Sequence, residues 1–285
     1  MREGNISLDF DSLLSDSIAS PPSLYLKLQD ALENPETTFA DYAQIISADT
    51  AFAFRILKIV NSPFYGYNEP IDSIAHAVDI LGTGKLTDLT IAALVIDKFK
   101  GIPKDLLVMD DFWRHSIACG LGAQAVARMK KEPDSERFYL SGLLHDIGSL
   151  LLYQQEPVKS RMLLEEARRK RKNLFSVEEQ YLGFDHAKLG GALLRKWRLP
   201  QMFVDAAQWH NHPDQAQDFP QIAQAVHLAD SIAYEMKLGT SGEPGVPPIT
   251  PDLLNTLKLS EENLQGIRDA IMKDFQQMTE LFLGV

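Results

Sequence analysis

The sequence predicts an all-helical protein, and two observations carry that prediction. Apolar residues recur at helical spacing in nearly every segment of the 285 residues, whereas strand-like alternation never extends beyond a few residues. Proline, glycine and capping residues separate one apolar stripe from the next, as they do at helix ends. We find no internal repeat and no low-complexity tract, so a repeat architecture is not expected.

Residues 1–105 are predicted to form an N-terminal helical subdomain. A helix over 23–33 has an apolar face, and Thr38 with Asp41 matches the capping-box pattern that starts the next helix. Later helices are predicted over residues 52–60, 71–81 and 85–99. The first of these ends at Asn61, because Pro63 cannot continue a helix.

Residues 106–285 are predicted to form a second helical subdomain. Its helices are predicted over 112–129, 136–153, 157–172, 186–197, 201–209 and 220–236, with a last helix that begins at Ser260. Ser176 and Glu179 match a second capping-box pattern, and Asp185 is placed to cap the helix that follows it. Residues 239–248 are rich in glycine and proline and are predicted to form a loop.

Composition excludes several classes of protein. Hydrophobic residues make up 45% and charged residues 24% of the chain, as in ordinary globular proteins. No apolar stretch approaches the roughly 18 residues of a membrane-spanning helix, and the first residues lead into polar sequence rather than a secretory signal. Cys119 is the single cysteine, which excludes an internal disulfide and suits a reducing compartment. We therefore expect a cytoplasmic protein that does not bind membranes.

The net charge of −11 argues against broad affinity for nucleic acid, because such binding depends on neutralising phosphates. The run Arg168–Lys172 is a local exception. It lies at the end of a predicted helix, where cations complement the helix dipole, and we interpret it first as a solvated helix end. A patch that binds phosphate or an acidic partner is the alternative.

The pair His145-Asp146 lies within the apolar run Leu143–Leu152 and is the first candidate for a functional site. A carboxylate and an imidazole among so many aliphatic side chains should be withdrawn from water. An isolated buried carboxylate is costly unless something compensates its charge. The compensator is either a basic side chain or a metal ion.

Four further residues join this pair as candidates: His115, His186, His210 and Asp230. A single histidine near a helix end is more often a cap or a core residue than a ligand. Asp230 also has an alternative partner in His227, one helical turn earlier. Taken together, histidines and aspartates on separate helices can form a mixed nitrogen and oxygen site for a divalent first-row metal.

The order of these residues resembles the HD superfamily of metal-dependent phosphohydrolases. A narrower resemblance, to the HD-related output domain (HDOD) family, covers most of the chain. Its motifs are Pro22-Ser23-Leu24, Ile45–Asp49, Arg55–Tyr65, Ile74–Gly82, Gly142–Gly148, His186–Leu194 and Trp197–Pro200, of which Val60–Tyr65 is the most specific.

The HDOD resemblance implies one continuous helical unit, with the N-terminal helical part packed on an HD-like core. It also implies a role in bacterial signal transduction, as a module that binds signalling proteins or a small phosphorylated ligand. His115, His145, Asp146 and Asp230 match the four metal ligands of the HD pattern.

Other positions bear on the number of metal ions. His186 and His210 match histidines that HD phosphodiesterases use for a second metal or for phosphate. Ser149 stands where the HD pattern has lysine, and Asn211 stands where a second histidine usually follows the first. No Gly-Tyr-Pro motif follows Pro213, so a cyclic dinucleotide phosphodiesterase of the HD-GYP type is not expected. We expect one divalent ion, and its identity among Fe, Mn, Ni, Zn and Mg stays open.

Two functions remain open at this point. One is a non-catalytic signalling module whose pocket serves stability or sensing. The other is a metal-dependent phosphohydrolase that acts on a nucleotide or another phosphoester, with water activated by the metal. In that enzyme, Asp146 would orient the water, and His186 and His210 would contact phosphate or donate protons.

Overall fold

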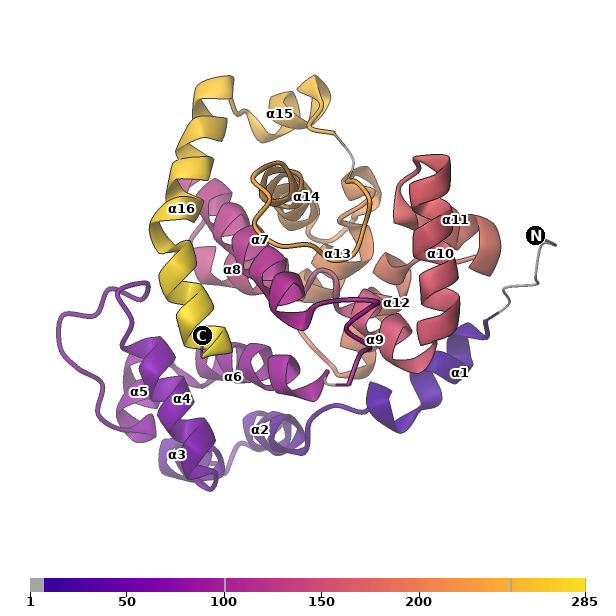
Figure 1. Ribbon diagram of the computed structural model, residues 1–285. Coiled ribbons are helices and arrows are strands. Elements are labelled where there is room, and N and C mark those ends of the chain that lie inside the picture. Colours follow the sequence, from indigo (N-terminus) through magenta and orange to yellow (C-terminus); the bar gives the residue numbers. More distant parts are fainter. Residues whose placement is uncertain (1–7, 100, 247, 285) are drawn as a thin grey trace. The chain divides into compact units, whose positions relative to one another are not determined.

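The computed structural model describes residues 8–99, 101–246 and 248–284, and every regular element in these ranges is a helix (Figure 1). The predicted all-helical class is therefore confirmed. The described residues divide into two compact units. The larger unit contains the chain up to Ser20 together with Phe99–Phe275, and the smaller unit contains Pro21–Lys98 together with the chain from Gln276. The predicted subdomain boundary at residues 105/106 stays a prediction.

The smaller unit matches the helix predicted over 23–33 at both ends, whereas the helices predicted over 52–60, 71–81 and 85–99 begin two or three residues from their predicted starts. Its helices are α2 (Ser23–Glu33), α3 (Phe39–Ser47), α4 (Thr50–Val60), α5 (Ile74–Leu81) and α6 (Thr83–Lys98). At the start of α3, the Thr38 hydroxyl accepts from the Asp41 amide at 3.1 Å, and the Asp41 carboxylate accepts from the Thr38 amide at 3.0 Å. Asn61 follows α4, and its side chain exchanges two hydrogen bonds of 2.7 Å with the backbone of Ile71. This amide therefore fastens the connection between α4 and α5.

The larger unit is built around a central helix. Its elements are α1 (Phe10–Ser15), η1 (Ser17–Ala19), α7 (Met109–Met129), α8 (Ser135–Leu144), α9 (Ile147–Gln155), α10 (Pro157–Lys170), α11 (Leu174–Leu182), α12 (His186–Lys196), α13 (Gln201–Trp209), η2 (Pro213–Gln215), α14 (Pro220–Glu235) and α15 (Pro251–Leu257). The helix α16 (Glu261–Leu283) begins here, capped by Ser260 as predicted. The central helix α7 packs against α8 and α14. None of the described helices is both long and apolar enough to cross a membrane.

Two glycines allow the helices of the larger unit to approach one another closely. A Cβ atom on Gly142 of α8 would lie 2.7 Å from the Cα atom of Gly120 on α7. A Cβ atom on Gly148 of α9 would lie 2.0 Å from the carbonyl oxygen of His186 on α12. Both distances are shorter than any carbon contact allows, so these two helix pairs require glycine at these positions.

The single helix predicted over 136–153 is wrong, because the structure breaks it at His145-Asp146 into α8 and α9. Asp146 has φ −96° and ψ 16°, outside the helical range. The apolar spacing continues across this break, so periodicity alone does not reveal it. The turn lets α8 pack on α7 while α9 packs on α12, and it leaves His145 and Asp146 at the junction.

Candidate metal centre

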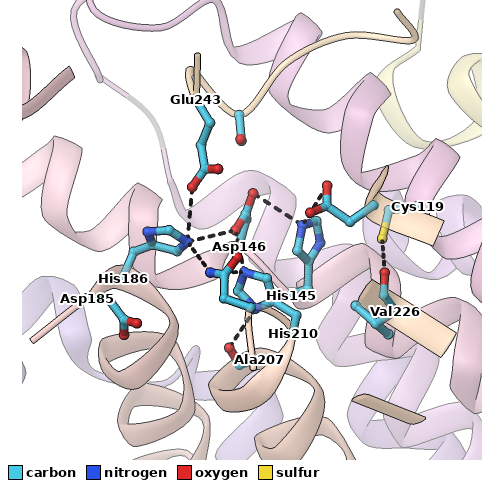
Figure 2. A network of polar contacts seen from close by, with 12 residues as sticks. Cys119, His145, Asp146, Asp185, His186, Ala207, His210, Val226 and Glu243 are labelled. Carbon is cyan, nitrogen blue, oxygen red and sulfur yellow. Dashed lines mark hydrogen bonds and ion pairs between the residues drawn. The ribbon is translucent and has the colours of Figure 1, made fainter. Parts of the chain in front are cut away.

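All six predicted site residues lie in the larger unit and point toward a common interior region. They are His115 on α7, His145 and Asp146 between α8 and α9, His186 at the start of α12, His210 at the end of α13, and Asp230 on α14. Each of them is at most 5% exposed. Figure 2 shows four of them turned toward one another: His145, Asp146, His186 and His210.

The four residues that match the HD ligand pattern, His115, His145, Asp146 and Asp230, are called the HD quartet here. Asp230 Oδ1 lies 2.9 Å from His115 Nε2 and 3.9 Å from His145 Nε2. Asp146 Oδ2 lies 3.2 Å from His145 Nε2. Within the described chain, the ion pairs of both aspartates are with histidines only, so no lysine or arginine compensates them.

The alternative pairing of Asp230 with His227 is not formed. His227 Nδ1 instead donates to the carbonyl oxygen of His210 at 2.5 Å. Asp230 faces the quartet, where its nearest nitrogen belongs to His115. His227 therefore supports the backbone beside His210 and is not a partner of this carboxylate.

Hydrogen bonds at Nδ1 orient three of the imidazoles. His145 Nδ1 donates to the carbonyl oxygen of Gly142 at 2.7 Å, and His210 Nδ1 donates to that of Ala207 at 2.9 Å. His186 Nδ1 donates to the Glu178 carboxylate at 2.6 Å. Metal-binding histidines characteristically use the second ring nitrogen in this way, because the bond fixes the ring and directs Nε2 at the ion.

Several quartet atoms are buried and close together without forming hydrogen bonds. In the part of the chain that the structure describes, no hydrogen-bond partner exists for His115 Nε2, His145 Nε2, Asp146 Oδ1 or Asp230 Oδ1. Leaving such a group unpaired costs roughly 1–3 kcal/mol. Two ligands about 2.1 Å from one ion are separated by about 3.0–3.4 Å in octahedral or tetrahedral geometry. The quartet separations of 2.9 and 3.2 Å are close to that range, so these residues fit a divalent ion.

Electrostatics within the quartet also favour a cation. Burial lowers the pKa of His145, but the nearby Asp146 carboxylate and Cys119 together hold that pKa well above its ordinary value. Burial raises the pKa of Asp146, but His145 and the neighbouring histidines hold it well below its ordinary value. The site therefore concentrates negative charge that must be balanced by a proton or by a metal ion. Metal binding displaces protons from such ligands.

His186 and His210, called the histidine pair here, lie beside the quartet. Their Nε2 atoms are 3.5 and 3.4 Å from Asp146 Oδ1. The ligand atoms of these three residues all lie within 4.8 Å of one another, as do those of His115, His145 and Asp146. Both groups share Asp146, so the geometry alone offers two positions for an ion.

Asn211 occupies the space between the two imidazoles of the histidine pair. Its amide nitrogen lies 3.0 Å from His210 Nε2 and 3.3 Å from His186 Nε2. Burial and the charge of His145 lower the pKa of His210 to about 3, so this ring stays neutral and accepts from the amide. Asn211 thus serves the histidine pair as a hydrogen-bonding neighbour, and its side chain is 94% buried (6% exposed).

Sequence reasoning missed Glu178, which it treated as part of a second capping box. That box is wrong: α11 begins at Leu174 after Asn173, and Glu178 lies inside it with no exposed surface. The Glu178 carboxylate accepts from both the backbone amide and Nδ1 of His186, at 2.9 and 2.6 Å. The sequence could have indicated that Glu178 is buried, because it lies four residues after the apolar Leu174 and residues four apart share a helix face. The cap predicted at Asp185 is confirmed, because the backbone amide of Lys188 donates to the Asp185 carboxylate at 2.7 Å.

Glu243 was also missed, and the sequence contains no signal for it. It belongs to the glycine- and proline-rich loop predicted at 239–248, and its Oε1 lies 3.3 Å from His186 Nε2 (Figure 2). Burial raises the pKa of Glu243 well above its ordinary value, although His186 opposes the shift. The loop is held by Tyr153, which donates to Ser241 at 3.1 Å, and by Tyr234, which donates to Pro244 at 2.7 Å.

The chain is similar in sequence to a curated protein from Treponema pallidum (strain Nichols), named "Uncharacterized protein". The two are 26% identical over 271 residues, which is 92% of this chain and 50% of that protein. The chain therefore spans about half the length of the curated relative it matches.

Solved structures share the fold at 20–22% identity. An HDOD domain protein with unknown function from Geobacter sulfurreducens superposes with a TM-score of 0.75 at 20% identity, covering 96% of both chains. A "Putative phosphohydrolase" from Shewanella amazonensis SB2B gives a TM-score of 0.72 at 22% identity, covering 95% of this chain and 97% of that one. A "Putative signal transduction protein" from Marinobacter aquaeolei VT8 gives 0.72 at 21% identity, covering 94% and 61%.

The HDOD domain profile matches residues 18–213, a range that includes every predicted site residue except Asp230. The match extends over more than half of the chain and agrees with the helical fold shared with the solved structures. The chain belongs to the HDOD domain family.

Proposed function

We propose that this chain is a signal-transduction module with a pocket for one divalent cation, and that the pocket binds a ligand rather than turning it over. One observation carries the proposal. His115 Nε2 and His145 Nε2 lie 2.9 and 3.9 Å from Asp230 Oδ1, yet none of these three buried atoms has a hydrogen-bond partner among the described residues. A cation would satisfy all of them at once.

The surroundings of the quartet support a single ion. The Asn211 amide stands between His186 and His210, where a second ion would need free Nε2 atoms. A second ion held by both of these Nε2 atoms would have to displace the Asn211 amide.

Burial supports binding over turnover. The quartet and the histidine pair are at most 5% exposed, and Glu243 is 8% exposed. Its carboxyl group lies against His186 Nε2, the atom that would otherwise contact a phosphoryl group. Ser149, where the HD pattern has lysine, is fully buried and offers no positive charge to a phosphate.

A metal-dependent phosphohydrolase is the second candidate, and the complete HD quartet favours it. A bound divalent ion would acidify a water molecule and polarise a phosphoryl oxygen. Asp146 would orient the attacking water, and His186 and His210 lie within 3.5 Å of the same carboxylate, in reach of a phosphate beside it. One similar structure carries a phosphohydrolase name and another a signal-transduction name, so these names agree with both candidates.

Signalling proteins and a small phosphorylated ligand are the proposed partners. The net charge of −11 disfavours nucleic acid. A cytoplasmic location stays a prediction, and so does the range of metals that the quartet accepts: Fe, Mn, Ni, Zn or Mg.

The test is metal analysis of the purified chain, followed by titration with each of these ions and a screen of phosphomonoesters, phosphodiesters and nucleotides. One ion per chain without turnover on any substrate supports the module. Turnover that is lost in Asp146→Asn, but retained when the exposed Asp218 is changed to Asn, supports the enzyme. Failure of every ion to bind contradicts both candidates.

A further inference from the structure

The basic run Arg168–Lys172 is not one uniform charged helix end. Glu166 neutralises two of its members, because its carboxylate lies 2.7 Å from Arg169 Nη2 and 2.8 Å from Lys170 Nζ. These contacts lower the pKa of Glu166 to about 2. The remaining cations are Arg168, Arg171 and Lys172. Among the described residues, neither Arg171 nor Lys172 has a carboxylate partner, and Arg168 donates only to the carbonyl oxygen of Gly242 at 3.5 Å.

These three cations line a pocket of about 250 Å³ between the end of α10, the start of α11 and the loop residues 239–246. It is lined by Arg168, Arg171, Lys172, Asn173, Pro244 and Gly245. The lining contains no acidic side chain. In a chain with a net charge of −11, a concave surface with three cations and no anion selects for a negatively charged ligand.

Backbone donors add to this charge. Asn173 is the N-cap residue of α11, and its side chain makes no capping hydrogen bond. The first N–H groups of a helix have no partner within the helix, and the helix dipole makes that end positive. In the described chain no side chain caps this helix end, which begins beside the pocket. Helix starts of this kind bind phosphate groups when cations accompany them.

We propose that this pocket binds the phosphate group of a small phosphorylated ligand. The charge favours a dianion, which Arg168, Arg171 and Lys172 can contact with charge-assisted hydrogen bonds. The volume suits a phosphate with an attached group, because about 250 Å³ equals the space of about eight water molecules at roughly 30 Å³ each. The site is separate from the metal centre and does not rest on the proposed function.

The position of the pocket connects it to the buried cluster. Pro244 and Gly245 form one wall, and the preceding residue, Glu243, reaches inward to His186 at 3.3 Å. Arg168 holds the same loop through Gly242. A ligand in the pocket would therefore contact the loop segment that covers the histidine pair.

The test is calorimetric titration of the full chain with inorganic phosphate and with pyrophosphate. The protein is first freed of metal with a chelator, and sodium chloride keeps the ionic strength constant. We expect saturable binding that weakens at least about tenfold, or about 1.4 kcal/mol, in the double variant Arg171→Gln/Lys172→Gln. The matched control Lys104→Gln/Lys273→Gln removes the same charge from exposed positions outside the pocket and should bind as the unchanged chain does.

Two further measurements locate the anion. The variant Asp146→Asn, which alters the metal centre, should leave phosphate binding intact. Amide NMR signals of Asn173 and Gly245 should shift with phosphate in the unchanged chain and not in the double variant. Thermal unfolding should be the same in all charge variants, since Arg171 and Lys172 are exposed.

Three results would overturn the proposal. The first is an absence of saturable binding at constant ionic strength. The second is an equal loss of affinity in the double variant and in the Lys104/Lys273 control, which would indicate an effect of net charge. The third is a loss of binding in Asp146→Asn with retention in the double variant, which would place the anion at the metal centre.

Discussion

The HD quartet and the histidine pair lie side by side, yet their ring nitrogens are satisfied in different ways. Both nitrogens of His186 and both of His210 have a hydrogen-bond partner within the protein. In contrast, both nitrogens of His115 and Nε2 of His145 have none among the described residues. The protein therefore supplies hydrogen-bond partners for the ring nitrogens of the histidine pair, but not for those of His115 or for Nε2 of His145.

This difference indicates what each half does. The quartet contains two carboxylates whose charge the protein does not balance with lysine or arginine, so its residues fit an ion from outside. The histidine pair has its own carboxylate in Glu178 and its own donor in Asn211, so it requires no ion to be stable. We expect the quartet to respond to metal and the pair to respond to changes in its hydrogen-bond partners.

The largest expected effect is the loss of metal binding when Asp146 is replaced. Asp146→Ala removes a carboxylate that faces His145, His186 and His210. Affinity for the quartet ion should fall by about 1,000-fold, or about 4 kcal/mol, in a metal titration. The control Asp218→Ala changes an exposed carboxylate and should leave the affinity unchanged. Equal metal affinity in Asp146→Ala and the unchanged chain would refute the quartet as the binding site.

The second effect is a loss of stability without a loss of metal. Glu178→Ala leaves the buried His186 without the partner of its Nδ1, and removing one member of a buried pair typically costs about 3 kcal/mol. Urea unfolding of the metal-free chain should show this loss, while metal affinity changes by less than about threefold. The neighbouring Glu179→Ala breaks a more exposed pair with Lys188 and should cost less than about 1 kcal/mol. A parallel fall in metal affinity in Glu178→Ala would mean that the two halves are one site.

The third effect would make the two halves more alike. Asn211→His replaces the amide between His186 and His210 with a further imidazole. We expect this variant to bind a second ion, because the new imidazole offers a metal ligand where the amide offered a hydrogen-bond donor. The second ion should bind at least about tenfold more weakly than the first. Metal analysis at saturation gives the stoichiometry, with Asn211→Gln as the control that keeps an amide. A stoichiometry of one in both variants would show that Asn211 is not what prevents a second ion.

The smallest effect is expected at Glu243. Burial raises the pKa of this carboxyl group well above its ordinary value, which favours the neutral form, and that form resembles an amide in charge and shape. Glu243→Gln should therefore change the free energy of unfolding by less than about 1 kcal/mol near pH 7, measured with urea. Glu243→Ala, which empties the space beside His186, should cost more. A large loss in Glu243→Gln would indicate that the charged carboxylate stabilises the cluster.

Much of this molecule was predictable from local sequence. The helices at Ser23–Glu33 and Gln201–Trp209 begin and end where the sequence predicts, because proline and capping residues act within one turn. Thr38 and Asp185 cap their helices as predicted for the same reason. The candidate residues of the site were also identifiable, since an acid or imidazole on an apolar helix face requires a partner.

Tertiary structure alone decided how those residues meet. The break at His145-Asp146 lies within continuous apolar spacing and follows from α8 and α9 packing on different helices. Glu243 reaches His186 only because contacts distant in sequence hold its loop. Local patterns report which side chains must be buried, whereas the distances among them depend on helix packing, which short-range spacing does not encode.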